Sequence, residues 1–528
     1  MVRTTNWHFQ EYSQKGALMA KNLLLSIDQG TTGSTALFLD ISNPLQPFIA
    51  AKATCDFPQH FPAAGWVEHD LNQIWESVCQ AISTAAEALG GKSALSKIAG
   101  IGISNQRETI CVFDRKDSTP LCNAIVWQCR RSTNICQDLK AKGFESVIRQ
   151  KTGLVLDPYF SASKISWLVQ NNPAVTEALK SGRAVLGTID CWLTHKLTNA
   201  VAHVTEASNA SRTMLFNIHT DSWDDELLKI FNVPSKACLP SVRESAGIFG
   251  VTKNVACLPD GIPISGIVGD QQAALAGQAC FKVGEAKCTF GTGAFLLLNT
   301  GHNAISPGNG ILTTVAWKLN GKLTYALEGS SFIAGAAVQF IRDQFNFLEF
   351  ARDSEMLAQK GSASPELYFV PALAGLSAPW WEPTARGAIL GMHRGTTKND
   401  VIRAALEGIA LQVADLARAM KTLLGEDLKV LRVDGGAAAN NFLMQFQANL
   451  LNVAVDRPRD IESTAVGAAL FAGLGIGAYK NLEDLVASRA SEKLFAPTAL
   501  PEEQQRIQVI KQGWLRAVEA VKIFGKNN

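Results

Sequence analysis

Short apolar runs alternate with amphipathic stretches along the first half of the chain. Three runs have the length and composition of buried strands: residues 23–27, 36–39 and 98–103. Between the last two, apolar side chains recur at the spacing of one helix face: Leu71, Ile74, Trp75, Val78, Ile82, Ala85 and Leu89. Asp70 with Gln73 resembles a capping box at the start of this helix, and Gly90-Gly91 would end it. The pattern predicts a core-facing helix between two strands.

The second half of the chain repeats this alternation. Strands are predicted at residues 285–290, 295–298 and 430–433, and helices at residues 404–420 and 440–451. A chain of 528 residues exceeds the size at which single hydrophobic cores stop growing, so two domains of roughly 250 residues are expected. No low-complexity tract separates the halves, which indicates a tight crossover near Gly277. The sequence thus predicts an α/β protein with one lobe over residues 21–277 and a second over residues 278–528.

Residues 1–20 are polar, lack periodicity and differ in character from the rest of the chain. Met19-Ala20-Lys21-Asn22 leads directly into the first strand, so Met19 is a candidate for the natural start, with an extended reading frame before it. A short docking segment is the alternative. We expect these twenty residues to be an extension that is disordered or not native.

Two Gly-Thr turns lie about one domain length apart, each near an aspartate. Asp28-Gln29-Gly30-Thr31-Thr32-Gly33 joins the first two strands, and Phe290-Gly291-Thr292-Gly293 joins two strands after Asp270. Glycine lets backbone N–H groups approach phosphate oxygens closely, and the threonine hydroxyls add donors. Either turn alone is more often an ordinary polar β-turn. Two of them, each near an aspartate suited to Mg²⁺ or to proton transfer, indicate a two-lobed phosphotransferase.

Residues 86–93 (AEALGGKS) match a loose form of the P-loop pattern. A P-loop follows a strand and opens a helix, so that the helix N-terminus faces the phosphates. This segment instead ends a predicted helix and would present the negative end of its dipole. We therefore assign nucleotide binding to the Gly-Thr turns.

Composition argues against several other classes of protein. Lys plus Arg number 49 against 47 for Asp plus Glu, and no basic run or stripe points to nucleic acid. The eleven cysteines are scattered without zinc-ligand spacing, and we expect buried thiols in a reducing compartment. No run of about 18 apolar residues is present, and the start of the chain lacks the apolar centre of a signal peptide. We expect a cytoplasmic protein without membrane insertion.

Several separated blocks of sequence resemble the FGGY carbohydrate kinases. Two resemble the general signatures of that family: YFSASKISW at residues 159–167 and GAILGM at residues 387–392, continued to Leu406-Glu407. Six more resemble the branch of the family that phosphorylates glycerol: GWVEHD at 65–70, NQRET at 105–109, AIVWQCR at 124–130, DPYF at 157–160, NASRTMLFN at 209–217 and GDQQ at 269–272. Agreement runs from about Lys21 to near the C-terminus, so chance agreement is negligible.

The resemblance implies two actin-like (ribonuclease H-like) ATPase lobes with a ligand cleft between them. It also implies ATP and Mg²⁺ as cofactors, glycerol as the phosphoryl acceptor with sn-glycerol 3-phosphate as product, and a homodimer or homotetramer. It assigns Asp270 as the general base, a role that could coexist with capping of a helix, and Asp28 as the Mg²⁺ partner. Two alternatives stay open. One is another FGGY kinase acting on a different polyol or ketose, and the other is a non-catalytic actin-like ATPase or sensor, which should lack the acceptor residues.

The resemblance places the nucleotide on both lobes. Thr31, Thr32 and Gly33 match contacts with the β- and γ-phosphates. Residues of the second lobe match the rest of the nucleotide site: Thr292 at a phosphate, and Gly335, Gln339, Gly436 and Asn440 in the pocket. Taken alone, Gly335 is typical of close helix packing and Asn440 of a helix cap.

The acceptor site is assigned in the same way. Glycerol has three hydroxyls on a thin carbon frame, so a selective site needs polar groups at the oxygens and flat apolar walls. The matching polar residues are Arg107, Glu108, Tyr159, Asp270 and Gln271, and the matching walls are Trp127 and Phe295. Taken alone, the two walls are more often core residues, and Arg107 with Glu108 could be a surface salt bridge worth under about 1 kcal/mol. Their place at the end of a predicted strand favours a site.

The first Gly-Thr turn departs from the family pattern. Many relatives read Gly-Thr-Thr-Ser-Ser-Arg there, whereas this chain has Gly33 in place of a serine and Thr35 in place of the arginine. A guanidinium makes bidentate, charge-assisted bonds to phosphate that a hydroxyl cannot make. Weaker nucleotide affinity is therefore expected.

Overall fold

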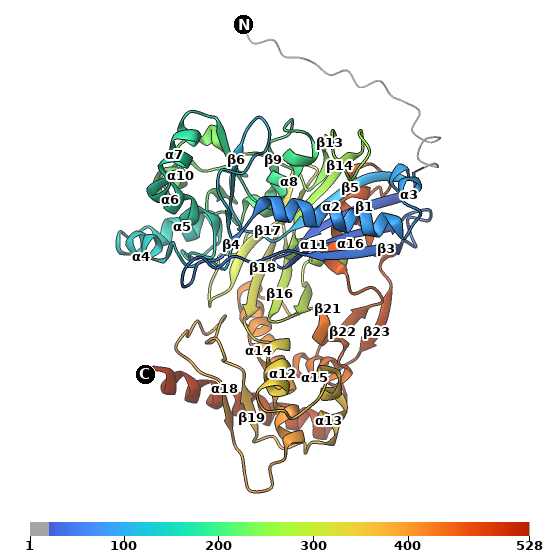
Figure 1. Ribbon diagram of the computed structural model, residues 1–528. Helices are drawn as coiled ribbons and strands as arrows, with labels where there is room; N and C mark the ends of the chain where they lie inside the picture. The colour runs from blue at the N-terminus through green and yellow to red at the C-terminus, as the bar shows by residue number, and fades with distance from the viewer. Residues whose placement is uncertain (1–20, 527–528) are drawn as a thin grey trace.

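Two β-sheets, one from each half of the chain, form the framework of the computed structural model, which describes residues 21–526 (Figure 1). Residues 1–20, for which the sequence predicts an extension, lie outside the described residues. The first sheet has six strands in the order β13 (Ala246–Val251), β14 (Pro263–Gly269), β5 (Ile98–Asn105), β1 (Leu23–Gln29), β2 (Gly33–Asp40) and β3 (Phe48–Asp56). The second has seven in the order β17 (Leu312–Leu319), β18 (Lys322–Ser331), β16 (Ala294–Gly301), β15 (Glu285–Phe290), β21 (Val430–Asp434), β22 (Val455–Pro458) and β23 (Ser491–Phe495).

The two sheets repeat one topology. β1 pairs antiparallel with β2 and parallel with β5, while β15 pairs antiparallel with β16 and parallel with β21. Each Gly-Thr turn therefore joins the first two strands of its sheet. The α/β prediction and both strand–turn–strand predictions are confirmed.

One helix from each half of the chain crosses to the sheet of the other half. α11 (Asp270–Gly277) shares a buried apolar cluster with Leu297 and Trp317 of the second sheet. α16 (Ser463–Gly475) shares another with Leu24 and Leu37 of the first sheet. Both helices lie between the sheets, packed on each other (Figure 1). Each sheet thus has its inner face covered by a helix from the opposite half.

Glycines allow these close contacts. A Cβ at Gly467 of α16 would lie 1.9 Å from the carbonyl oxygen of Ala273 in α11. A Cβ at Gly102 of β5 would lie 2.1 Å from the carbonyl oxygen of Ala468. No side chain fits at either position, so the contacts are made by backbone against backbone. They fix α11, and with it Asp270, against both sheets.

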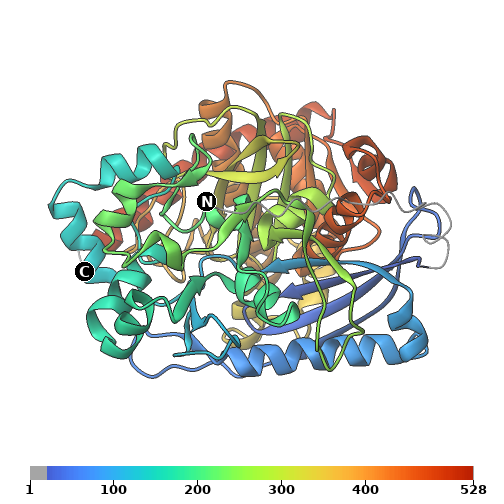
Figure 2. The same cartoon turned by 90° about the horizontal axis from the view of Figure 1, so that it is seen from above.

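The predicted first-lobe helix is α2 (Leu71–Glu87), which packs against β2 and β3. In Figure 2 it is the long blue helix beside the blue strands. Asp70 caps it by accepting the backbone N–H of Asn72 at 2.8 Å. The predicted capping box is wrong, because the Gln73 side chain bonds to the His60 ring instead. Residues 86–93, which match the loose P-loop pattern, follow no strand. Gly90 and Gly91 both have positive φ, and only the short helix α3 (Lys92–Ser96) begins after them.

The long helix of the second half is α14 (Lys398–Leu424), longer at both ends than the predicted 404–420. Thr397 and Asp400 form a capping box at its start, and Gly425 ends it in the left-handed conformation with φ 79°. The predicted range left out the buried residues Val401 and Ile402 in the first turns, so the apolar face of the helix is longer than predicted.

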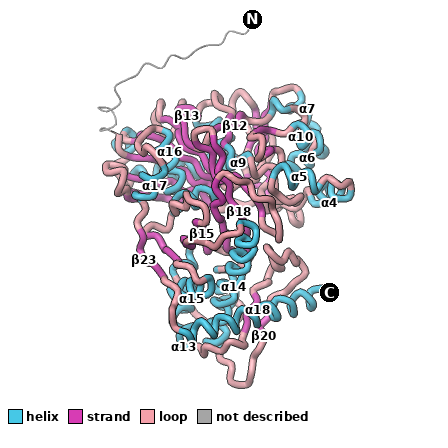
Figure 3. Tube along the Cα trace, turned by 180° about the vertical axis from the view of Figure 1, so that it is seen from behind, coloured by secondary structure: helices cyan, strands magenta, loops and turns pink. Residues whose placement is uncertain are grey.

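The remaining elements surround this framework, with α13, α14, α15 and α18 together at the end remote from the first sheet (Figure 3). The helices of the first half are α4 (Thr133–Ala141), α5 (Glu145–Thr152), α6 (Ser161–Asn171), α7 (Pro173–Lys180), α8 (Ile189–Leu197), α9 (Ala207–Ala210) and α10 (Asp225–Ile230). Those of the second half are α12 (Gly335–Asp343), α13 (Ser354–Lys360), α15 (Asn441–Leu451), α17 (Leu482–Ser488) and α18 (Pro501–Lys526). Short strand pairs are β4 (Glu68–His69) with β7 (Ala124–Ile125), β6 (Cys111–Asp114) with β8 (Ala184–Gly187), β9 (Val204–Glu206) with β12 (Ser241–Arg243), β10 (Phe216–Asn217) with β11 (Ser222–Trp223) and β19 (Tyr368–Val370) with β20 (Ala388–Leu390).

Among the helices between residues 21 and 526, none combines the length and the apolar character that a membrane span requires. Seven of the eleven cysteines are buried and four are partly exposed, so the expectation of buried thiols holds for most of them.

Candidate functional site

Arg107 and Glu108 follow the end of β5, where the backbone makes an unusual turn. Glu108 has a φ of 62°, which is uncommon for a residue with a side chain and recurs at functional sites. The Ser161 hydroxyl donates to the Glu108 carbonyl oxygen at 2.9 Å and holds the turn. Arg107 and Glu108 are only 3% and 1% exposed. The alternative interpretation as a surface salt bridge is therefore wrong.

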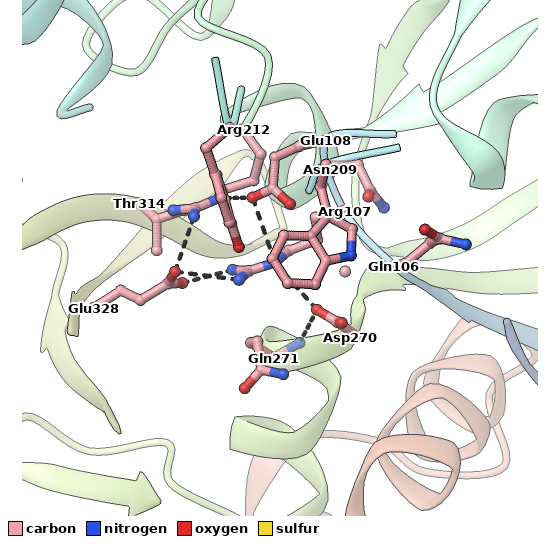
Figure 4. Close-up of polar contacts among 12 residues, drawn as sticks. Gln106, Arg107, Glu108, Asn209, Arg212, Asp270, Gln271, Thr314 and Glu328 are labelled. Carbon is pink, nitrogen blue, oxygen red and sulfur yellow. Dashed lines mark hydrogen bonds and ion pairs between the residues drawn. The ribbon is translucent and has the colours of Figure 1, made fainter. Parts of the chain in front are cut away.

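Five charged side chains form a buried charge cluster: Asp270, Arg107, Glu328, Arg212 and Glu108 (Figure 4). Both Nη atoms of Arg107 donate to the Glu328 carboxylate, at 2.5 and 3.1 Å. Arg212 donates to Glu328 at 2.8 Å and to Glu108 at 2.6 Å. The Arg107 Nε lies 3.1 Å from Asp270 Oδ1. Negative and positive groups thus alternate, and the cluster joins the end of β5 to β18 in the other sheet.

The cluster sets the protonation of its carboxylates. Burial alone would raise the pKa of Glu328, but the Arg107 and Arg212 guanidiniums hold it at about 2. Burial raises the pKa of Asp270, while Arg107 opposes the rise. The Asp270 side chain is 29% exposed, against 4% or less for the other four. A carboxylate with a raised pKa at the open end of the cluster is suited to accept a proton.

Asp270 is the first residue of α11, and its neighbour is oriented by a buried lysine. Asp270 Oδ1 accepts the Gln271 backbone N–H at 2.6 Å, so it also satisfies a donor at the helix start. The Lys287 ammonium donates to Gln271 Oε1 at 2.5 Å and to Thr289 at 2.9 Å. Because an ammonium only donates, the amide oxygen must face Lys287. The Gln271 NH₂ group is therefore turned away from Lys287.

Aromatic side chains stand beside these polar groups. The Trp127 and Tyr159 rings have centroids 5.3 Å apart and an interplanar angle of 62°. Trp127 Nε1 donates to the Thr31 hydroxyl at 2.9 Å, which connects this wall to the first Gly-Thr turn. Within residues 21–526, the Phe295 ring makes no aromatic contact with Trp127 or Tyr159. It lies on β16 opposite Ser330, on the same face of the second sheet as Glu328.

The first Gly-Thr turn is a tight hairpin. The Gly30 N–H donates to the Gly33 carbonyl at 2.9 Å, leaving Thr31 partly exposed and Thr32 exposed. A Cβ at Gly33 would lie 2.7 Å from Asp56 Oδ1 on β3. A side chain at position 33 would therefore require the Asp56 carboxylate to move.

Asp28, at the end of β1, lies in an environment that favours a cation. Its Oδ1 accepts the Ser104 hydroxyl at 2.6 Å. Burial raises the pKa of Asp28 to about 7, and the negative charges of Asp270 and Glu462 contribute to the rise. A positive ion beside this carboxylate would relieve the repulsion.

The second Gly-Thr turn borders a cavity of about 390 Å³. All five residues assigned to the nucleotide in the second lobe line it: Thr292, Gly335, Gln339, Gly436 and Asn440. A Cβ at Gly335 would lie 2.7 Å from the Gly291 carbonyl oxygen, so α12 can start against the turn only with glycine. Asn440 caps α15 by accepting the Leu443 N–H at 2.9 Å and lines the cavity as well.

Several site residues are missing from the sequence-based assignment. The main ones are Glu328, Arg212 and Lys287, all buried. A signal was available for two of them, because Glu328 and Lys287 each have apolar residues on both sides in their strands, and a buried charge requires a partner. Which partner each one has depends on the packing of the two sheets, and no local pattern encodes it.

Comparison with known proteins identifies the class. The FGGY family of carbohydrate kinases matches over both of its domains, the N-terminal domain at residues 23–277 and the C-terminal domain at residues 286–476. The chain belongs to the FGGY family of carbohydrate kinases.

Individual relatives indicate which kinases of this family the chain is similar to. A glycerol kinase of Bacillus cereus is 47% identical over 504 residues, which cover 96% of this chain and 100% of the relative. The glycerol kinase of Bacillus cytotoxicus is 46% identical over 501 residues, covering 95% and 99%. Among solved structures, Plasmodium falciparum glycerol kinase with ADP has a TM-score of 0.87 and 35% identity, covering 95% of this chain and 98% of that one. A Lactobacillus acidophilus gluconate kinase has a TM-score of 0.85 at 24% identity and shares the fold. The actin-like two-lobed fold expected from the sequence is confirmed.

Glu328→Gln should destabilise the protein strongly, because it leaves two buried guanidiniums with too little counter-charge. Removing one partner from a buried ion pair costs about 3 to 5 kcal/mol. The thermal unfolding midpoint should fall by several degrees. Glu519→Gln is the control, since Glu519 pairs with Lys522 on the surface of α18 and its loss should matter little. Equal midpoints for wild type and Glu328→Gln would contradict a structural role of the cluster.

Proposed function

We propose that this protein is a glycerol kinase, which transfers the γ-phosphoryl group of ATP to glycerol and forms sn-glycerol 3-phosphate and ADP. The observation that carries the proposal is the similarity to glycerol kinases along the full length of the chain, at 47% identity over 504 residues. Membership of a carbohydrate-kinase family supports ATP as the phosphoryl donor.

Glycerol would bind at the open end of the buried charge cluster. The polar side chains are Arg107, Glu108, Tyr159, Asp270 and Gln271, with Trp127 and Phe295 as walls. The buried Arg107 Nε lies 3.1 Å from Asp270 Oδ1, an ion-pair contact, but its N–H makes no hydrogen bond within residues 21–526. A glycerol oxygen would supply the missing acceptor, which is a reason for the site to prefer a hydroxyl compound. The Gln271 NH₂ group, turned away from Lys287, is a further donor.

Asp270 would accept the proton of the attacking hydroxyl. Its raised pKa makes it a stronger base than an ordinary aspartate, and its partial exposure lets a substrate reach it. Its Oδ1 is held by Gln271 N–H and lies beside Arg107, so the carboxylate is oriented before the substrate binds. Because phosphoryl transfer is largely dissociative, orienting the hydroxyl is as much a part of this role as removing its proton.

Asp28 fits a Mg²⁺ partner, and the phosphates would lie between the two Gly-Thr turns. Within residues 21–526, no group of three or more His, Cys, Asp or Glu side chains could hold a metal on its own. One carboxylate combined with water and phosphate oxygens is a common way to bind Mg²⁺, which neutralises phosphate charge. Thr31, Thr32 and Gly33 would contact the β- and γ-phosphates and Thr292 another phosphate. The rest of the nucleotide would occupy the cavity lined by Gly335, Gln339, Gly436 and Asn440.

The organisation of the molecule agrees with the same proposal. Residues 21–277 would form the lobe that holds glycerol and phosphate, residues 278–528 the lobe that holds the nucleotide, with the reaction in the cleft between them. Glu328 belongs to the second sheet, yet its carboxylate accepts hydrogen bonds from Arg107 of the first half. Residues of both halves would therefore contribute to the acceptor site. Assembly as a homodimer or homotetramer and a cytoplasmic location stay predictions.

ADP release with and without glycerol tests the function directly. We expect ATP and Mg²⁺ to give rapid ADP release with glycerol and very little without it. The panel should include a tetritol, a pentulose and dihydroxyacetone as competing acceptors. A higher kcat/KM for any of these would favour another FGGY kinase. ADP release at the same rate with and without every acceptor would favour the alternative of an actin-like ATPase or sensor that phosphorylates no acceptor.

Asp270→Asn should lower turnover at least about 100-fold, the usual scale for a general base, because it removes the proton acceptor and keeps the shape of the side chain. Glycerol binding should largely survive, since most hydrogen bonds to the substrate remain. Turnover at saturating ATP and glycerol, together with glycerol titration by calorimetry, measures both. Turnover near the wild-type value would show that the assigned role is wrong.

Thr35→Arg should tighten ADP binding. Thr35 pairs with Asp28 across β1 and β2, so its side chain is on the same face of the sheet as that carboxylate. One charge-assisted bond to phosphate is worth about 1.5 to 3 kcal/mol, roughly 10- to 100-fold in Kd. The apparent KM for ATP should fall with turnover largely kept.

Thr54→Arg is the matched control, because Thr54 pairs with Thr35 on the next strand, one strand further from Asp28. Titration of ADP into wild type, Thr35→Arg and Thr54→Arg measures the three dissociation constants. Equal or weaker binding by Thr35→Arg would show that position 35 does not serve the phosphates.

A further inference from the structure

Two cysteines from distant parts of the first lobe meet at the edge of its core. Cys79 lies in α2 and Cys257 in the loop between β13 and β14, and their sulfur atoms are 2.9 Å apart. A disulfide bond is about 2.05 Å long, so a shift of less than 1 Å separates this contact from a covalent bond. Both residues are partly exposed, so a small oxidant can reach them.

The loop that carries Cys257 is held in place on both sides of the cysteine. The Thr252 hydroxyl donates to the Pro259 carbonyl at 2.6 Å, and the Gly261 N–H donates to the Thr252 carbonyl at 2.8 Å. Val255 and Leu258 are buried in the apolar cluster that also contains α2. The sulfur of Cys257 is thus presented to α2 by an ordered turn, and the contact does not depend on a loose segment.

The surroundings make the two thiols unequal. Cys257 donates its S–H to Cys79, and this hydrogen bond, with the nearby Lys196 ammonium, lowers the pKa of Cys79 against the effect of burial. Donation and burial raise the pKa of Cys257. Lys196 is held over the Trp75 ring, one helical turn before Cys79. Since the thiolate is the reactive form, Cys79 is the nucleophile and Cys257 the resolving thiol.

We propose that Cys79 and Cys257 are a covalent modification site, oxidised to a reversible disulfide by hydrogen peroxide. The Cys79 sulfur attacks one peroxide oxygen, the O–O bond breaks, and water leaves with Cys79 as sulfenic acid. The Cys257 sulfur then attacks the Cys79 sulfur, the S–S bond forms, the S–O bond breaks, and the hydroxyl group leaves as a second water with the Cys257 proton. Two thiols lose two electrons and two protons, and one peroxide becomes two waters. A dithiol reductant reverses the reaction by thiol–disulfide exchange.

The position of the pair predicts what the bond would do. α2 packs against β2 and β3 on the side of the first sheet opposite to α16, away from the buried charge cluster. Both cysteines belong to one lobe, so the bond would leave movement between lobes free. We expect the oxidised protein to unfold at a higher temperature than the reduced one and to keep its activity. Disulfides of this kind in reducing compartments are usually transient and redox-sensing.

The test uses the full-length protein, oxidised with equimolar hydrogen peroxide and then blocked with N-ethylmaleimide. Mass spectrometry of a non-reduced digest should find one peptide pair joined through Cys79 and Cys257, lighter by two hydrogens and separated again by dithiothreitol. Cys55→Ser is the matched control, since Cys55 is another partly exposed cysteine of the first lobe, and it should give the same joined pair.

Two variants test the assigned roles. In Cys257→Ser, oxidation of Cys79 should stop at the sulfenic acid, which dimedone labels, whereas Cys79 of the wild type should show little labelling. In Cys79→Ser, Cys257 should remain a free thiol. Absence of the joined peptide while other cysteines oxidise, or equal dimedone labelling of Cys79 in wild type and Cys257→Ser, would overturn the proposal. Neither result depends on kinase activity, so this inference and the proposed function can fail separately.

Discussion

The removal of five charged groups from water is the constraint on which the site depends. Arg107, Arg212 and Glu328 are almost wholly buried, and a buried charge is tolerated only when it is paired and hydrogen-bonded. Two guanidiniums between three carboxylates meet this condition. Among these five groups the carboxylates outnumber the guanidiniums by one, and the carboxylate nearest to solvent is Asp270. The group proposed to accept a proton is therefore the end of a chain of charges fixed by the fold.

The same cluster requires both sheets. Arg107 and Glu108 come from the end of β5, and Glu328 comes from β18 of the other sheet. Asp270 opens α11, which packs against the second sheet and touches α16 through its backbone. The residues proposed to bind the acceptor are thus positioned by contacts that neither half of the chain could make alone. The pocket in the second lobe depends less on this arrangement, because all of its lining residues, among them residues of α12, α13, α14 and α15 and of the second Gly-Thr turn, come from the second half of the chain.

Local patterns in the sequence were sufficient to locate several of the helices and strands and the residues near turns. The apolar repeat of α2, the strands around Gly30 and Gly291, and the polar residues after β5 are all encoded in short stretches of chain. The capping box at Asp70 failed because Gln73 found a tertiary partner in His60. Glu328 and Arg212 were missed for the same reason, since their importance lies in partners more than 100 residues away. The residues proposed to bind substrate came from the resemblance to a family, whereas the buried residues that hold them in place became visible only in the packed structure.

The exchange of helices between the halves affects how the chain must fold during synthesis. The inner face of the first sheet, with Leu24, Leu37 and Leu39, is covered by residues of α16 and by Leu485 of α17. These residues leave the ribosome more than 400 positions after β1, so the first lobe emerges with an apolar face that nothing yet covers. Exposed apolar surface and late long-range contacts favour slow folding and aggregation. The first lobe therefore reaches its native core only when synthesis is nearly complete.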